Sequence, residues 1–200
     1  MSDSPPAMID AVFEIAGETL PAAYPFLLWR ELSRLLPLIV GHASVGVLPL
    51  RTTASAYGLL LARRAKLVIR IPDALRGEVM ALEGKSCQLG EHVMQIQAGK
   101  FRPILPFPTI QSHLVSGDRD ELSFMQNMAA TLEQLGIAGH LICGRKAVLE
   151  GGGHSIHGFN LVIHDLKADD SLRLQQAGLG DYRRYGCGAF VPYKVIADLH

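Results

Sequence analysis

A glycine-rich segment near the C-terminus carries the residues best suited to hold an anion. Two Gly-x-Gly pairs bracket five residues that include two tyrosines, and the glycines and arginines concerned are Gly178, Gly180, Gly186, Gly188, Arg183 and Arg184. Glycines at this density reach positive φ without strain and allow backbone N–H groups to approach a ligand. A concavity of such groups beside cationic side chains suits a phosphate. The segment is expected to join a helix at 168–176 to a strand at 189–193, which reverses the strand-to-helix order of a dinucleotide-binding motif.

The same segment resembles the C-terminal signature of the RAMP superfamily: Gly-hydrophobic-Gly, five residues with at least one Lys or Arg, then Gly-hydrophobic-Gly. Within that superfamily the chain is most similar to the CRISPR-associated endoribonucleases that cut repeat RNA into guides. The similarity extends into Phe190, Val191 and Pro192, and the chain length and order of elements agree. The resemblance implies two tandem ferredoxin-like units that bind a repeat stem-loop and cleave near its 3′ base, leaving a 2′,3′-cyclic phosphate and a 5′-hydroxyl. It also implies that the protein can stay on the guide RNA within a CRISPR effector complex.

Eight histidines supply the candidates for acid–base chemistry. Metal-independent RNA cleavage needs one group that removes the proton of the 2′-hydroxyl and another that protonates the leaving 5′-oxygen, and histidine titrates close enough to neutral for either task. His42 is the first choice because it lies in a short loop after the first predicted helix, a region where the related enzymes commonly place a histidine. The alternative is that His42 is only an exposed loop residue. We interpret His113, His140 and His164 as ordinary residues of apolar strands.

Three residues near His42 in the sequence are candidate catalytic partners: Tyr24, Ser44 and Arg51. A tyrosine could orient the nucleophile, and an arginine could stabilise the extra negative charge on phosphorus in the transition state. The family keeps no fixed constellation beyond the histidine, so the resemblance assigns none of these roles. A structural role remains the alternative for each residue.

A second histidine pair, His154 and His157, follows three consecutive glycines. The H-x-x-H spacing could serve zinc, but no acidic or cysteine partner stands at a recognisable spacing, so we predict neither a metal site nor a cofactor. An RNA-contacting loop fits better, in which Arg145, Lys146 and His154 touch phosphates or the grooves of a hairpin. RNA hairpins are recognised largely through backbone, shape and unpaired bases. The sequence also lacks the G-x-S-x-G, Walker and H-E-x-x-H motifs of other enzyme classes.

The composition is that of an ordinary soluble globular protein. Of 200 residues, 48% are apolar and 6% are aromatic, which is enough to bury a sizeable core. No apolar run is long enough to cross a bilayer, and residues 1–6 show no basic region followed by an apolar stretch, so we expect a cytoplasmic protein. Cys87, Cys143 and Cys187 are odd in number and lack C-x-x-C spacing, as expected of thiols in a reducing compartment.

The net charge of zero counts against nucleic-acid binding, because such proteins often carry a basic excess. A gathering of cations on one face would offset this, and three groups could provide it: Arg30 with Arg34, Arg183 with Arg184, and the cluster of Arg63, Arg64, Lys66 and Arg70. Two further classes of function therefore stay open. One is a non-catalytic RAMP subunit that binds guide RNA and needs no histidine, and the other is a ferredoxin-like protein that binds a small ligand or a protein partner.

The order of the predicted elements indicates an α+β fold of two ferredoxin-like βαββαβ units. Apolar periodicity predicts strands at 9–15, 45–50 and 66–71, a strand or a hairpin turning near Gly90 at 86–97, and helices at 25–39 and 72–82, the first of which Pro37 should end or kink. It then predicts strands at 110–115, 139–143, 156–164 and 189–193 with helices at 120–135 and 168–176. Three prolines within 103–108 resist both helix and central strand. We therefore predict an N-terminal domain at 1–99 with the catalytic histidine, a linker at 100–108, and a C-terminal domain at 109–200 with the glycine-rich RNA-binding loop.

Overall fold

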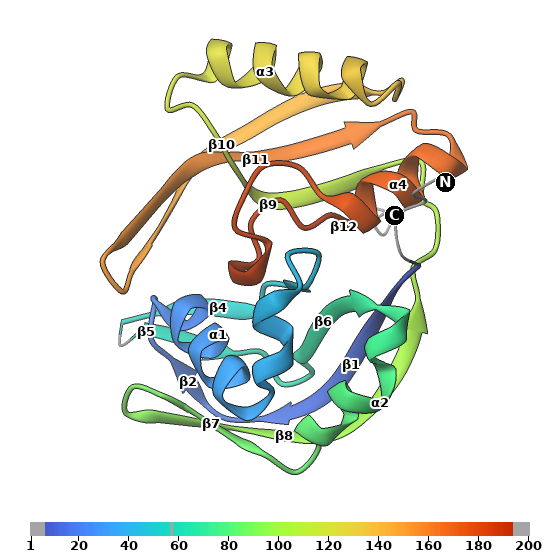
Figure 1. Ribbon diagram of the computed structural model, residues 1–200. Coiled ribbons are helices and arrows are strands. Elements are labelled where there is room, and N and C mark those ends of the chain that lie inside the picture. Colours follow the sequence, from blue (N-terminus) through green and yellow to red (C-terminus); the bar gives the residue numbers. More distant parts are fainter. Residues whose placement is uncertain (1–6, 57, 194–200) are drawn as a thin grey trace, which may run out of the picture. The chain divides into compact units, whose positions relative to one another are not determined.

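The computed structural model describes residues 7–56 and 58–193, which form two compact units (Figure 1). Unit 1 comprises the described residues up to Ile104, together with Leu149–Ile156 and Tyr182–Gly186. Unit 2 comprises Leu105–Val148, His157–Asp181 and the described residues from Cys187 onward. Residues 1–6, on which the expectation of no leader segment rested, lie outside the described residues. None of the described helices is both long and apolar enough to span a membrane.

Unit 1 is built on a five-stranded antiparallel sheet with the order β3-β6-β1-β8-β7. Without β7, this is the strand order of a ferredoxin-like βαββαβ unit. Its elements are β1 (Met8–Ala16), α1 (Tyr24–Leu35), β3 (Gly46–Val47), β6 (Lys66–Pro72), α2 (Arg76–Val79), β7 (Ser86–Leu89) and β8 (His92–Pro103), with short 3-10 turns η2 (Asp73–Leu75) and η3 (Met80–Leu82) on either side of α2. The helices and the sheet enclose an apolar core to which β1 contributes Ile9, Ala11 and Phe13.

A small three-stranded sheet in unit 1 departs from the expectation. It has the order β2-β5-β4 and consists of β2 (Thr19–Leu20), β4 (Thr52–Ser55) and β5 (Gly58–Leu61). Strands of two to four residues carry too little periodicity to be found in a sequence. The strand expected at 45–50 is likewise reduced to the two residues of β3, although the Leu48 amide still donates to the Val68 carbonyl at 2.9 Å.

Helix α1 follows from its apolar spacing and its prolines. Leu28 and Leu32 lie one turn apart and are fully buried, and Pro25 occupies the first turn, where its missing N–H costs nothing. Proline disfavours the helical conformation in the residue before it, and α1 ends at Leu35, ahead of Pro37. The chain continues as the 3-10 turn η1 (Pro37–Gly41). The helix expected at 25–39 is therefore divided at this proline.

Unit 2 repeats the same strand order. Its elements are β9 (Ile110–Ser116), α3 (Glu121–Gln134), β10 (His140–Gly151), β11 (His154–His164), α4 (Ala168–Ala177) and β12 (Val191–Pro192), and the sheet order is β10-β11-β9-β12. The Asp120 carboxylate caps α3 by accepting from the Ser123 amide at 2.9 Å. Phe124 of α3 and Leu174 of α4 pack with Phe159 of β11 in an apolar core. The predicted α+β class with two ferredoxin-like units is confirmed.

The boundary between the units lies between Ile104 and Leu105, inside the segment expected to be a linker. Strand β8 continues through the first part of that segment to Pro103, which pairs with Ile9 of β1. A proline is tolerated there because β7 pairs only with residues 92–95 of β8. At Pro103 the strand is therefore an edge strand that needs no N–H on its outer side.

The central strands of unit 1 bury an ion pair. Asp10 lies opposite Arg70 in the β1–β6 register and opposite Arg102 in the β1–β8 register. Its carboxylate accepts from Arg70 Nε at 2.8 Å, from Arg70 Nη2 at 3.2 Å and from Arg102 Nη2 at 3.1 Å. Asp10 and Arg70 are each only 2% exposed, so neither charge can turn to water without breaking the sheet apart. Arg70, expected in a surface cluster of cations, is therefore a core residue.

Replacing Asp10 with alanine is expected to lower the free energy of unfolding by about 3–5 kcal/mol, because the buried guanidinium of Arg70 then loses its carboxylate partner. A urea titration followed by circular dichroism measures this. Asp73→Ala is the matched control: it removes an exposed pair with Arg76 and should cost no more than about 1 kcal/mol. Asp10→Asn should fall between the two. Equal stability of Asp10→Ala and the control would contradict the role given to this pair.

Candidate active site

His42 lies in an exposed loop of unit 1 between η1 and β3. The loop backbone is held at both sides of the residue. The His42 amide donates to the Ile39 carbonyl at 3.2 Å, and the His42 carbonyl accepts from the Val45 amide at 3.0 Å. Ile39 and Val45 are each 1% exposed, so the loop is anchored in the core of the unit while the imidazole faces solvent. Loops fixed in this way by rigid elements are where catalytic side chains often lie.

Tyr24, expected as a catalytic partner, is buried and already engaged. Its hydroxyl accepts from the Leu50 amide at 2.9 Å, and its side chain belongs to the core of unit 1. Burial raises the pKa of the Tyr24 phenol, and the Leu50 hydrogen bond offsets part of the rise. A neutral, enclosed phenol of this kind fastens the start of α1 to the chain just before Arg51 rather than meeting a substrate.

Ser44 and Arg51 remain accessible on the segment that follows His42. Ser44 is half-buried and Arg51 is exposed. The Arg51 carbonyl accepts from the Ala62 amide at 2.9 Å, which fixes the backbone while leaving the guanidinium in solvent. Both residues lie within unit 1 together with His42.

An aromatic-lined cavity of about 440 Å³ lies on the outer side of α1 in unit 1. Helix α1 contributes Phe26, Trp29, Arg30 and Ser33 at helical spacing. The other walls are Val40 of η1, His154 of the β10–β11 turn and Tyr185 of η4 (Arg183–Tyr185). Ala23, Leu27 and Gly152 complete the lining. The rings of Phe26 and His154 stack at 5.7 Å with 9° between their planes, and Phe26 meets Tyr185 at 4.6 Å. Val40 is only two residues from His42, so the candidate catalytic loop borders this cavity.

The turn between β10 and β11 reaches α1 because Gly151 has no side chain. A Cβ at this position would lie 2.6 Å from Ala23 Cβ and 2.8 Å from Phe26 Cδ2, and its φ of +158° disfavours other residues as well. His154, expected as an RNA-contacting residue, is thereby placed against Phe26 while it remains exposed. The first glycine of the run is thus a packing requirement, whereas a Cβ at Gly153 would meet no atom within 4 Å.

The glycine-rich segment joins α4 to β12, as expected, and its four motif glycines all have positive φ. Their amides, however, are largely used within the fold: those of Gly178, Gly186 and Gly188 donate to the carbonyls of Leu174, Arg183 and Leu114 at 2.7–2.9 Å. At Gly188 a Cβ would lie 1.8 Å from the Leu179 carbonyl oxygen. The expected phosphate cradle of backbone N–H groups is therefore not what these three glycines form, because their amides are bonded to backbone carbonyls of the fold.

The two arginines of the motif differ in their surroundings. Burial, followed by the positive charge of Arg70, lowers the pKa of Arg183 to about 10, so this residue is still protonated at neutral pH. Arg184 is exposed, and its guanidinium lies 5.0 Å from the centre of the Tyr185 ring. Arg184 and Tyr185 therefore present a cation and an aromatic face on the same turn, whereas Arg183 belongs to the packing of unit 1.

Arg145 and Lys146, the other expected RNA contacts, are exposed residues of β10 in unit 2. Adjacent strand residues point to opposite faces of a sheet, so the two cations do not form one patch. The Lys146 ammonium donates to the Arg119 carbonyl at 2.8 Å.

Sequence reasoning missed Phe26, Trp29 and Val40. The available signal was a second stripe on α1, in which Phe26, Trp29, Arg30 and Ser33 recur at the 3–4-residue spacing of a helix face, opposite Leu28 and Leu32. Arg30 and Arg34, which were expected to form one group of cations, have different surroundings. Arg30 lines the cavity, whereas Arg34 pairs with Glu31 at 2.9 Å.

Cysteine chemistry is not supported by the thiols of unit 1 and unit 2. Burial raises the pKa of both Cys87 and Cys187 to about 12, and the carboxylate of Glu31 adds to the effect at Cys87. Burial also raises the pKa of Cys143. Protonated thiols are poor nucleophiles.

Comparison with known proteins places these features in a family. The family model described as Cas6 Crispr matches residues 9–195. The CRISPR-associated endonuclease Cas6 of Myxococcus xanthus (strain DK1622) is 30% identical over 186 residues, which cover 92% of this chain and 81% of that relative.

Solved structures share the fold at low sequence identity. The product of a Cas6-related gene from Pyrococcus furiosus superposes with a TM-score of 0.67 at 15% identity, covering 96% of this chain and all of the other. A RAMP protein that binds different RNA substrates gives a TM-score of 0.65 at 13% identity, with 91% and 98% coverage. Thermus thermophilus Cse3, bound to an RNA representing a pre-cleavage complex, gives 0.55 at 13% identity, with 92% and 98% coverage. Because the family model matches nearly the whole chain and one relative reaches 30% identity, the chain belongs to the Cas6 family of CRISPR-associated proteins.

Proposed function

We propose that this chain is a metal-independent endoribonuclease that cleaves CRISPR precursor RNA within its repeats to give guide RNA. The observation that carries the proposal is the exposed His42 on a backbone-anchored loop beside an aromatic cavity, in a chain of the Cas6 family. The substrate is a repeat stem-loop cut near the 3′ base of the stem. The alternative within the same fold is a guide-RNA-binding subunit without catalysis, which the first experiment below separates from the enzyme.

The reaction needs only proton transfers and charge stabilisation. The 2′-oxygen attacks phosphorus, the bond from phosphorus to the 5′-oxygen breaks, and the products are a 2′,3′-cyclic phosphate and a 5′-hydroxyl. The 2′-hydroxyl gives up one proton and the leaving oxygen gains one, so the step balances with one acid and one base. His42 serves as one of the two, because an imidazole can either accept or donate a proton near neutral pH.

The residues around His42 have supporting roles in this proposal. Arg51, with its guanidinium in solvent, stabilises the additional negative charge on the phosphoryl oxygens in the transition state. Ser44 offers a hydroxyl that can position the reacting phosphate. Tyr24 acts through its bond to the Leu50 amide by holding the segment that leads to Arg51, and is therefore a positioning residue.

RNA binding is assigned to stacking and to a small number of cations. The cavity presents His154 and Tyr185 from loops and Trp29 from α1, and aromatic rings of this kind bind unpaired bases through their faces. Arg30 supplies positive charge at this cavity, and Arg184 supplies it beside the Tyr185 ring. Arg145 and Lys146 add contacts from unit 2, and Gly178, Gly180, Gly186 and Gly188 shape the turn that carries Arg183 and Arg184.

Replacing His42 with alanine is expected to slow single-turnover cleavage of labelled repeat RNA by about 100-fold or more, because one proton-transfer group is lost. RNA affinity should be unchanged. The assay is a denaturing gel in excess EDTA, with His113→Ala as a matched control for an exposed histidine of unit 2. A substrate with a 2′-deoxy nucleotide at the cut should not be cleaved by any variant.

Each other outcome of that assay decides against part of the proposal. Cleavage by His42→Ala at the wild-type rate would remove His42 from the mechanism. Cleavage that stops in EDTA would remove metal independence. Binding without cleavage by the wild-type protein would favour the guide-RNA-binding subunit, and no binding at low salt would refute RNA as the ligand.

Replacing His154 with alanine is expected to weaken binding of repeat RNA by roughly 5- to 100-fold, because the stacking of one base on an aromatic face is worth about 1–3 kcal/mol. The cleavage rate at saturating protein should not change, since His154 takes no part in proton transfer. His154→Phe retains an aromatic face and should restore most of the affinity. Equal affinities of the alanine variant and the wild type, measured by filter binding, would exclude the cavity from RNA recognition.

Replacing Arg184 with glutamine is expected to reduce the slope of log affinity against log salt concentration by about 1, as for the loss of one phosphate contact. Arg76→Gln is the comparison, because Arg76 is already paired with Asp73 at 2.5 Å and should leave the slope unchanged. The measurement is a titration of repeat RNA at several ionic strengths. Parallel slopes for wild type and Arg184→Gln would show that Arg184 does not contact phosphate.

A further inference from the structure

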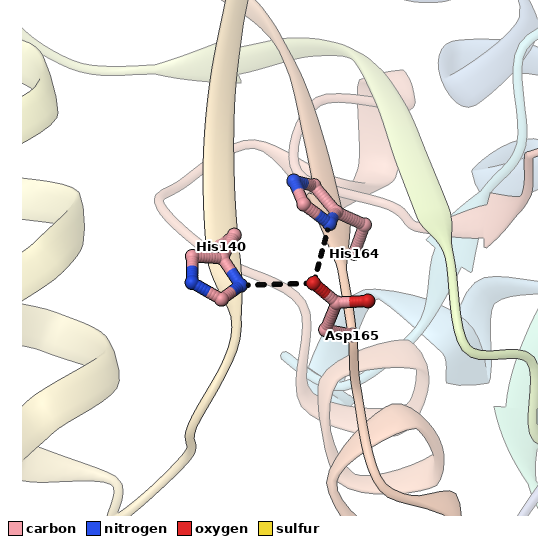
Figure 2. Close-up of side chains that lie close together, drawn as sticks. All are labelled: His140, His164 and Asp165. Carbon is pink, nitrogen blue, oxygen red and sulfur yellow. Dashed lines mark hydrogen bonds and ion pairs between the residues drawn. The ribbon is translucent and has the colours of Figure 1, made fainter.

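Two histidines and an aspartate converge at one end of the β10–β11 hairpin in unit 2 (Figure 2). His140 is the first residue of β10, His164 is the last residue of β11, and Asp165 follows directly. Consecutive strands of a hairpin bring the start of one beside the end of the other. From the sequence, His140 and His164 were interpreted as ordinary strand residues. That the two lie side by side was missed, because 24 positions separate them in the chain.

Both imidazoles contact the same oxygen of the Asp165 carboxylate. Asp165 Oδ2 lies 3.0 Å from His140 Nδ1 and 2.9 Å from His164 Nδ1, so both rings present the same nitrogen to one carboxylate oxygen. The ring centroids are 5.1 Å apart with 23° between their planes. Asp165 has a left-handed φ of 60°, a conformation that aspartate tolerates better than most residues and that sets the direction of its side chain after the strand ends.

The two nitrogen–oxygen spacings are close to those between the ligands of a tetrahedral metal ion, and the three ligand atoms all lie within 4.8 Å of one another. Bonds of about 2.0–2.1 Å to nitrogen and oxygen place the ligands of such an ion about 3.3–3.4 Å apart. The two observed nitrogen–oxygen separations of 3.0 and 2.9 Å need to widen by only a few tenths of an ångström. The side chains of His140 and Asp165 are 74% and 68% exposed, which leaves an entry path and room for a water molecule as fourth ligand.

We propose that His140, His164 and Asp165 form a binding site for a divalent transition-metal ion of the zinc type. Two imidazoles favour zinc, cobalt, nickel and copper, whereas magnesium and calcium prefer oxygen ligands alone. Among the described residues, this is the one group of three or more histidine, cysteine, aspartate and glutamate side chains whose ligand atoms lie within 4.8 Å of one another. The H-x-x-H pair of His154 and His157, which begins at the β10–β11 turn, is not part of that group.

The ion has a structural role. It ties the first residue of β10 to the end of β11 and so closes the long hairpin at its open end. An ion that binds the folded state alone stabilises it in proportion to its concentration over its dissociation constant. The site lies in unit 2 and supplies no group to the reaction proposed for His42. The proposal of a metal site therefore does not depend on the proposed function.

The test is a calorimetric titration of the untagged, metal-free full chain with zinc chloride alone. The expected result is one ion per chain and a melting temperature that rises with zinc concentration but not with magnesium. His140→Ala and His164→Ala should each lower the zinc affinity by more than about 100-fold. Loss of an outer-shell partner, which does not touch the ion, costs only roughly 10- to 100-fold. Asp165→Asn should also weaken it, with the left-handed backbone retained, since asparagine tolerates that conformation.

Two controls make the result decisive. His113→Ala and the double variant His154→Ala with His157→Ala should bind zinc as the wild type does. Absorption by cobalt in place of zinc should report tetrahedral coordination in the wild type and in these controls. No zinc binding by the wild type, or unchanged binding in His140→Ala and His164→Ala variants whose circular dichroism is native, would overturn the proposal.

Discussion

The ion pair between Asp10 and Arg70 sets the register of unit 1. Asp10 lies on the face of β1 opposite Ile9, Ala11 and Phe13, which enter the apolar core. A slip of one residue would turn the carboxylate into that core and the apolar side chains out of it. With Arg70 on one neighbouring strand and Arg102 on the other, the charge is satisfied in one register alone. The arrangement specifies the sheet more than it stabilises it, since buried ion pairs add little net free energy.

The same buried cation influences the glycine-rich segment. Arg183 of η4 packs near Gly46 of β3, which pairs with Arg70, and the pKa of Arg183 is lowered by burial and by the charge of Arg70. The turn is thus held by its arginine as well as by its glycines. Arg184 and Tyr185 can then face outward from a fixed backbone. The motif therefore positions the side chains of Arg184 and Tyr185, rather than presenting backbone N–H groups to an anion.

The sequence predicted the secondary structure where the apolar periodicity extends over a long segment. It also did so where a residue type favours one backbone conformation, as glycine does at positive φ. The patterns of α1, α3 and β1, which are 12, 14 and 9 residues long, were predictable. The glycines with positive φ and the order of elements in both ferredoxin-like units were predictable as well. The small β2-β5-β4 sheet was not, because its strands are too short to show a pattern. Of the aromatic cavity, only the stripe on α1 could be found in the sequence. Its other walls and the His140–His164 pair could not, since they depend on residues far apart in the chain that meet only after folding.

The absence of net charge bears on how such a chain would hold RNA. Its 19 cationic side chains are balanced by 19 acidic ones, and at least Arg70 and Arg183 are taken into the packing of unit 1. These two cations are therefore not available to release counterions from phosphates. Stacking is independent of net charge, because every base has a face, and α1 carries Trp29 beside His154 and Tyr185. In a neutral protein with this cavity, aromatic contacts are expected to supply a larger share of RNA affinity than electrostatics, with affinity correspondingly less sensitive to salt than in a basic RNA-binding protein.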